Sequence, residues 1–315
     1  MDMLLSVLAV VGGLVLLSWG ADRLIHGACG LARRARLSET VIGATIVAGG
    51  TSMPELVASV SGALAGQYGM AVGNVVGSNI FNAAFILGMV ALVAPMLVAR
   101  DIARRDWWVM AGVTTVFCLV VAAIGAITWW MAAISLLLFA GYVVWSVRVG
   151  GQADEAVDPT PVPPALAGIG WVVLGIALLA TGGHILVWGA AGLATMAGVS
   201  DTVIGLTVVA AGTSAPELVT SLVAARRGRH HLAVANIIGS NTFNLLFILG
   251  VTGLLGSLPV ATEILHRDLW VMLAVALVLP LAWGFAALRI GRAAGVCLLA
   301  GYLVYLGFLL WTVGN

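Results

Sequence analysis

The sequence predicts an all-α membrane protein with ten transmembrane helices in two inverted five-helix repeats, with broken helices near its centre. Three observations predict this fold class. Of the 315 residues, 62% are hydrophobic and only 9% are charged, which excludes an ordinary soluble globular domain. Long apolar segments recur along the chain. In addition, residues 38–88 are repeated without a gap at 200–250, and 30 of the 51 positions are identical.

Ten segments are long and apolar enough to cross a bilayer, because about 20 helical residues span roughly 30 Å of hydrocarbon. The expected spans are 3–30, 38–65, 69–95, 105–126, 128–147, 165–195, 200–225, 230–257, 268–287 and 291–312. The first span is expected to be retained rather than cleaved as a signal peptide, because it has no basic start. Its GACGLA at 27–32 also recurs as GAAGLA at 189–194.

Arginine placement predicts the orientation. The chain has no Lys and 14 Arg. Twelve of the arginines lie in or beside the loops that follow the first, third, fifth, seventh and ninth spans: Arg33, Arg34, Arg36, Arg100, Arg104, Arg105, Arg148, Arg226, Arg227, Arg229, Arg289 and Arg292. The positive-inside rule then places these loops in the cytoplasm and both termini outside it. Since each half has an odd number of spans, the second half must be inverted relative to the first.

The predicted repeats are 1–148 and 165–315, joined by a linker at 149–164. Four prolines and three acidic residues make this linker polar and extended, so we expect it to be a short cytoplasmic spacer. A regulatory cation site at Asp154, Glu155 and Asp158 is the alternative. The three cysteines, Cys29, Cys118 and Cys297, are expected to be small buried side chains within spans.

Each repeat contains a helix interruption followed by an acidic residue. The segments are GGTSMPEL at 49–56 and AGTSAPEL at 211–218, where a proline removes a backbone donor. Carbonyl groups freed by such a break are tolerated in a membrane only beside protein or a wet cavity. Each Glu shares a helical face with the hydroxyl residues before it: Thr51 and Ser52 with Glu55, and Thr213 and Ser214 with Glu217.

The span after each interruption carries a polar stripe at i, i+4 and i+8. The stripes are Asn74, Ser78 and Asn82, and Asn236, Ser240 and Asn244. These amides could simply hold helices together, and the two Glu residues could form a protonated pair. However, each buried acidic side chain costs about 2.5–3.5 kcal/mol on insertion scales. Two that face each other would balance one divalent cation, and the oxygen-rich surroundings favour calcium over magnesium or zinc. We therefore predict an ion site where the broken helices meet.

These residues resemble the cation/calcium exchanger superfamily, and within it the prokaryotic sodium/calcium exchanger (calcium/sodium antiporter) branch. The resemblance rests on GTSMPE at 50–55 with GNVVGSNIFN at 73–82, and on GTSAPE at 212–217 with ANIIGSNTFN at 235–244. These are the alpha-1 motif (38–88) and the alpha-2 motif (200–250) of such proteins. The GNxxE pattern typical of the proton-coupled branch is absent from both repeats.

The resemblance implies a secondary active antiporter that exchanges sodium for calcium by alternating access, and not an enzyme. It implies an integral protein of a prokaryotic inner membrane, with no cofactor, no nucleic acid and no obligate protein partner. Calcium and sodium are the implied cargo, and protons are the third candidate. A calcium/proton exchanger and a passive cation channel are the alternatives, while the absence of HExxH and GxSxG motifs disfavours an intramembrane enzyme.

The resemblance also implies which residues bind the ions. Around calcium it places Glu55, Glu217, Thr51 and Thr213. Around sodium it places Ser52, Ser78, Ser214 and Ser240, with backbone carbonyls near Ala48 and Ala210. Asn82 and Asn244 would complete the central site. Some relatives carry Asp at one of these last two positions, so this chain brings only two carboxylates.

Overall fold

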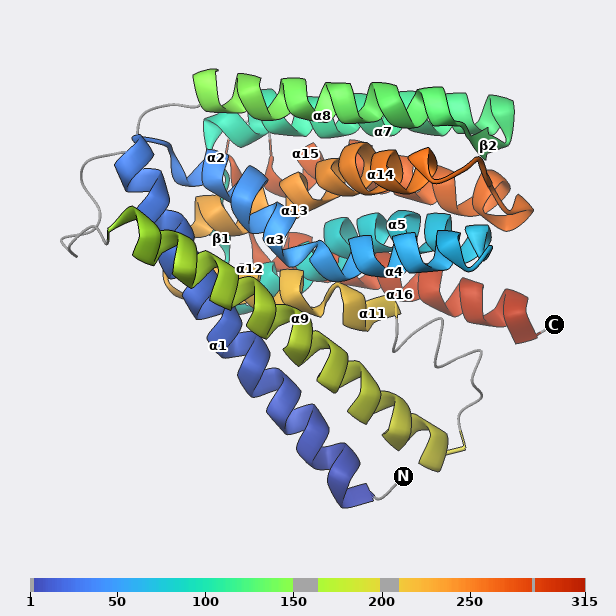
Figure 1. Ribbon diagram of the computed structural model, residues 1–315, viewed down its shortest axis with the longest axis horizontal. Coiled ribbons are helices and arrows are strands. Elements are labelled where there is room, and N and C mark those ends of the chain that lie inside the picture. The colour runs from blue at the N-terminus through green and yellow to red at the C-terminus, as the bar shows by residue number, and fades with distance from the viewer. Residues whose placement is uncertain (1–2, 150–163, 199–209, 285–286, 315) are drawn as a thin grey trace.

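The structure is a computed structural model that describes residues 3–149, 164–198, 210–284 and 287–314. Most helices lie side by side as one bundle, and two long helices, α1 and α9, cross it obliquely (Figure 1). Within the described ranges, eight helices are long and apolar enough to cross a membrane, or nine if the bent pair Glu39–Thr51 and Met53–Leu64 counts as one span. The first part of the expected span at 200–225 lies outside the described residues. Asp154, Glu155 and Asp158 of the linker also lie outside them.

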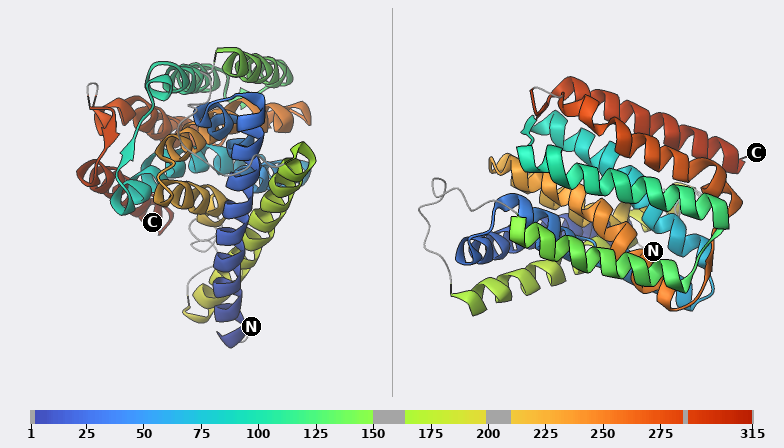
Figure 2. Two further views of the ribbon diagram at one scale, coloured as in Figure 1. Left: turned by 90° about the vertical axis from the view of Figure 1, so that its left-hand side faces the viewer. Right: turned by 90° about the horizontal axis from the view of Figure 1, so that it is seen from above.

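The helices α1 (Met3–Ala35) and α9 (Ala165–Met196) pack antiparallel against each other and project beyond the other helices (Figure 2). Both are longer than a perpendicular span requires, which fits their oblique course. Their contact consists of glycines seven residues apart, which keeps them on one face of each helix. These are Gly13, Gly20 and Gly27 on α1, and Gly168, Gly175, Gly182 and Gly189 on α9.

At these glycines the two long helices approach each other too closely for a Cβ atom. An ideal Cβ atom on Gly175 would lie 2.5 Å from the backbone nitrogen of Leu24. One on Gly27 would lie 2.7 Å from the carbonyl oxygen of Gly168. The backbones of the two helices therefore come into contact at these glycines.

The duplicated segments form the centre of the bundle. The first copy consists of α2 (Glu39–Ile42), η1 (Gly43–Val47), α3 (Ala48–Thr51), α4 (Met53–Leu64), α5 (Tyr68–Ile80), η2 (Phe81–Ile86) and α6 (Leu87–Val93). The described part of the second copy consists of α11 (Ala210–Thr213), α12 (Ala215–Arg226), α13 (His230–Phe243), η5 (Asn244–Ile248) and α14 (Leu249–Leu254). The segments labelled η are π-helical turns, which continue the helix with one extra residue.

The remaining elements surround this centre. They are η3 (Ile102–Asp106), α7 (Trp107–Ile124), α8 (Trp129–Val149), η6 (Ile264–Asp268), α15 (Leu269–Trp283) and α16 (Arg292–Gly314). Two short antiparallel pairs join the halves: β1 (Met96–Leu97) with β4 (Arg289–Ile290), and β2 (Ala126–Ile127) with β3 (Leu258–Pro259). These two-residue strands were not predicted from the sequence. Cys29 and Cys118 are buried as expected, but Cys297 is exposed, because α16 lies at the periphery with few buried residues.

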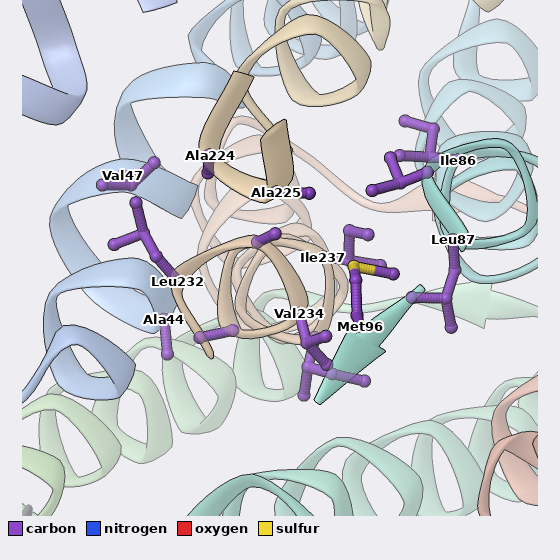
Figure 3. Packing of buried hydrophobic residues seen from close by; sticks show 14 of the residues in the cluster. Ala44, Val47, Ile86, Leu87, Met96, Ala224, Ala225, Leu232, Val234 and Ile237 are labelled. Atoms are coloured by element: carbon purple, nitrogen blue, oxygen red, sulfur yellow. The ribbon is translucent and has the colours of Figure 1, made fainter. Parts of the chain in front are cut away.

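The helix α13 lies at the heart of the apolar core (Figure 3). Its Val234 and Ile237 are fully buried and lie near Met96, Ile86 and Leu87 of the first half. The core therefore consists of side chains from both halves, which packs the two duplicated segments into one body.

Candidate cation site

Both broken helices are interrupted at a single serine. Ser52 (φ −83°, ψ 11°) separates α3 from α4, and the two parts of that span are bent by 46°. Ser214 (φ −89°, ψ 7°) separates α11 from α12 in the same way. Pro54 and Pro216 lie in the first turn of the helix that follows, where a missing N–H leaves no hydrogen bond unmade.

The two glutamates are buried and held by hydroxyl groups of the opposite copy. The Oγ of Ser52 donates a hydrogen bond of 2.8 Å to Glu217 Oε1, and the Oγ of Ser214 donates one of 2.8 Å to Glu55 Oε1. Both glutamate side chains are 0% exposed. The carboxylates therefore face the interior of the bundle and belong to one polar cluster, not to the lipid surface.

Each glutamate also lies in the first turn of its helix, α4 or α12. The unpaired N–H groups at a helix start favour negative charge there. No arginine pairs with either glutamate among the described residues, since the arginine ion pairs in those ranges involve Asp22, Glu39, Asp106 and Asp268. No basic side chain of the described residues therefore neutralises the two carboxylates.

Several oxygen atoms of the cluster are buried without a hydrogen-bond partner in the described part of the chain. They are Glu55 Oε2, Glu217 Oε2, Ser240 Oγ, Asn82 Oδ1 and Asn244 Oδ1. A buried polar atom left unpaired costs about 1–3 kcal/mol, so an accumulation of such atoms needs an explanation. Two carboxylate oxygens among neutral hydroxyl and amide oxygens form the donor set that hard cations such as calcium and sodium prefer. The described residues contain no group of three or more His, Cys, Asp or Glu that could hold a metal ion, so the two carboxylates would share a cation with neutral oxygen donors.

The first asparagine of each stripe has a structural role. Asn74 donates to the backbone oxygen of Glu55 at 3.1 Å and to Ser59 Oγ at 2.9 Å. Asn236 donates to Ser221 Oγ at 3.0 Å. These bonds tie each stripe helix to the broken helix of its own copy, so here the simple role of holding helices together is the one observed.

The threonines connect the broken helices to these asparagines across the copies. Thr51 Oγ1 lies 3.4 Å from Asn236 Oδ1, and Thr213 Oγ1 lies 3.5 Å from Asn74 Oδ1. Thr51 Oγ1 also donates to the carbonyl of Ala48, which accepts the N–H of Ser52 as well. The Ala48 carbonyl is thus paired within its own turn, contrary to the expectation that the break frees it.

Direct hydrogen bonds join seven of the twelve expected ligands in three separate groups: Ser52 with Glu217, Ser214 with Glu55 and Ser78, and Thr51 with the backbone oxygen of Ala48. Thr213 contacts Asn74, which is not one of the twelve. Ser78 enters through its 3.1 Å contact with Ser214. Ser240, Asn82 and Asn244 are buried on the same stripes, but no described hydrogen bond connects them to the carboxylates. Ala210 begins α11, and its side chain lies outside the described features.

The sequence analysis missed Asn79 and Asn241. Each donates its amide to the backbone carbonyl of the other, at 3.2 and 3.1 Å, and Asn244 Nδ2 donates to Asn79 Oδ1 at 2.9 Å. Both are identical in the two copies and follow the stripe serine directly, which was the available signal. They fasten α5 to α13 beside the carboxylates.

Comparisons with known proteins show which family the chain belongs to and which solved structures it resembles. The family model for the sodium/calcium exchanger protein matches residues 5–148 and 167–311. The chain is 38% identical to the putative antiporter CaxA of Alkalimonas amylolytica, over 98% of this chain and 97% of that protein. It is 33% identical to the sodium/calcium exchanger MaX1 of Methanosarcina acetivorans, over 96% and 97% of the two. A solved structure of the sodium-calcium exchanger NCX_Mj is similar with a TM-score of 0.84 and 31% identity, over 97% of this chain and 99% of that one.

Proposed function

The chain belongs to the sodium/calcium exchanger protein family, and from this premise we propose that it is a secondary active antiporter that exchanges sodium for calcium across the membrane by alternating access. One observation carries the proposal. Two buried carboxylates, one from each duplicated segment, are each held by a serine of the other segment and have no basic partner among the described residues. Bound cations would neutralise them.

We assign the proposed ligands to calcium or to sodium according to their charge. Glu55 and Glu217, with Thr51 and Thr213, would bind calcium, because two carboxylates balance its charge. The serines Ser52, Ser78, Ser214 and Ser240, with carbonyls near Ala48 and Ala210, would bind sodium, and Asn82 and Asn244 would complete the centre. A serine that donates its proton to a carboxylate keeps its oxygen lone pairs for a cation, so the observed hydrogen bonds and ion binding are compatible.

Coupling would follow from electrostatics. Moving an empty site across the membrane would bury two uncompensated charges, which is costly. A site filled by calcium or by sodium would avoid that cost. Since both ions need the same carboxylates, they would compete, and only filled carriers would cross. An exchange of three sodium ions for one calcium would move one net charge and couple about 2.3 kcal/mol per 100 mV to transport.

The proposed topology has ten spans in two inverted repeats, 1–148 and 165–315, with a cytoplasmic linker at 149–164 and both termini outside the cytoplasm. The odd number of spans per half and the arginine distribution support it. We place the protein in a prokaryotic inner membrane, where α1 and α9 would move against the remaining helices and expose the site to each side in turn.

The test is calcium uptake into proteoliposomes loaded with sodium, with radioactive calcium outside. Calcium should accumulate inside the vesicles above its outside concentration, and this accumulation should collapse when the sodium gradient is removed. Uptake should disappear in Glu55→Gln and in Glu217→Gln. Glu263→Gln is the matched control, because Glu263 is exposed and lies in the helical turn before η6, outside the duplicated segments. Unchanged uptake in either site variant would reject that residue as a ligand.

The same assay separates the alternatives. Uptake that persists without sodium and follows an imposed pH gradient would indicate calcium/proton exchange. Flux that no counter-gradient can drive uphill would indicate a passive channel.

A further inference from the structure

A second polar site lies at the periphery, away from the carboxylates. It is a cavity of about 490 Å³ between the start of α7 and the end of α8, lined by Asp101, Arg104, Arg105, Trp108, Trp145 and Val149 among others. Both helices are candidate membrane spans, so the cavity lies where each span reaches its end. The end of α8 is at the left of Figure 1, beside the end of α1. This is the arginine-rich end of the bundle.

One arginine of the cavity is fixed in place. Arg105 is only 9% exposed and forms two hydrogen bonds with Asp106, of 2.8 and 3.1 Å. Its guanidinium also lies 5.6 Å from the ring centre of Trp145. Ion pairing and stacking together therefore orient this side chain, which would otherwise be long and flexible.

The other lining groups offer hydrogen-bond donors that the described protein does not use. Arg104 is exposed and has no ion pair within the described ranges. The indoles of Trp108 and Trp145 can only donate, as can a guanidinium. Asp101 is the one acidic side chain of the lining. With Arg100 and Arg148 adjacent in sequence, the surroundings of the cavity carry more positive than negative charge.

The equivalent position in the second half has different residues around the same ion pair. Arg267 forms the same paired bonds with Asp268, at 2.7 and 3.2 Å. There, however, the guanidinium also donates to Thr312 at 3.1 Å, and Tyr305 donates to Asp268 at 3.0 Å. At the offset of 162, His266 corresponds to Arg104 and Gly307 to Trp145. The ion pair is thus common to both halves, whereas Arg104 and Trp145 have no arginine or tryptophan counterpart in the second half.

We propose that this cavity binds the headgroup of an anionic phospholipid with a hydroxylated headgroup, such as phosphatidylglycerol. Its phosphodiester accepts from Arg104 and the indoles, its hydroxyls donate to Asp101, and its acyl chains lie along α7 and α8. Basic pockets between membrane helices on the cytoplasmic side bind such headgroups. Tryptophan in turn favours the interface between water and lipid.

The test measures lipid binding to the purified full chain by native mass spectrometry and by thermal unfolding. Added phosphatidylglycerol should remain bound and raise the unfolding midpoint. Arg104→Gln should weaken binding about fivefold, the effect expected for one basic side chain near an anionic headgroup. Arg226→Gln, which alters another exposed arginine at the same end, should leave binding unchanged.

A second variant tests the hydroxyl contact. Asp101→Asn should reduce the preference for phosphatidylglycerol over phosphatidic acid, because phosphatidic acid has no headgroup hydroxyl and gains from the lost negative charge. Equal binding by Arg104→Gln and the unmodified protein would overturn the proposal. Equal stabilisation by phosphatidylethanolamine would also overturn it, because the site would then not require a net negative charge. Equal stabilisation by inorganic phosphate alone would overturn it as well, because the site would then not require a lipid.

Discussion

A single methyl group at Gly175 should force the two long helices apart. An ideal Cβ atom there lies 2.5 Å from the nitrogen and 2.7 Å from the Cα of Leu24, which is fully buried in the middle of α1. Ordinary contact begins near 3.4 Å, so the backbones must separate by about 0.9 Å. Because the obstructing atoms are backbone, no rotamer change relieves the clash. Overpacking of this kind costs about 1–3 kcal/mol.

The matched control is Gly170→Ala on the same helix, where an added Cβ meets nothing within 4 Å. Both changes gain the same helix propensity, about 1 kcal/mol in favour of alanine. The difference between them therefore isolates the clash. In thermal unfolding of the purified protein, Gly175→Ala should be less stable than Gly170→Ala by about 1–3 kcal/mol. Equal stability of the two variants would refute the close approach of α1 and α9.

Two further substitutions test the contacts between the halves. Asn79→Ala should destabilise more than Asn241→Ala in the same assay, because Asn79 also accepts from Asn244 and each buried partner left unpaired costs about 1–3 kcal/mol. Equal losses of stability in the two variants would contradict the additional hydrogen bond between Asn244 and Asn79. A double-mutant cycle of Asp22→Asn and Arg227→Gln should give a coupling below about 1 kcal/mol, since the Arg227 side chain is 50% exposed. A coupling of several kcal/mol would show that this ion pair between α1 and α12 is better shielded than the geometry indicates.

Much of the centre could be predicted because the chain repeats itself. One acidic residue within an apolar segment indicates a buried polar site, and two at equivalent positions, Glu55 and Glu217, indicate it more strongly. In the structure each glutamate accepts a hydrogen bond from a serine of the other copy. The proline and glycine pattern located both breaks. The stripes were harder, because Asn74 and Asn82 look alike in sequence while one bonds its own broken helix and the other has no described partner.

Other features depend on distant contacts that no local pattern reveals. Asp22 pairs with Arg227, and Glu39, in the first turn of α2, pairs with Arg229. The β1–β4 and β2–β3 pairs likewise join segments far apart in the sequence. The seven-residue glycine spacing of α1 and α9 was visible in the sequence, but the extent of their approach depends on both helices at once.

The π-helical turns have a consequence for how the chain can vary. Deleting one residue from η2 (Phe81–Ile86) would restore regular winding and rotate everything after it by about 100°, with a shift of about 1.5 Å. The same holds for η5 (Asn244–Ile248) in the second copy. The residues after each turn, from Leu87 and from Leu249 onward, would keep their identity yet face another side of the helix. Insertions and deletions are thus penalised more than replacements in these helices, which gives a mechanical reason why the two copies align without a gap.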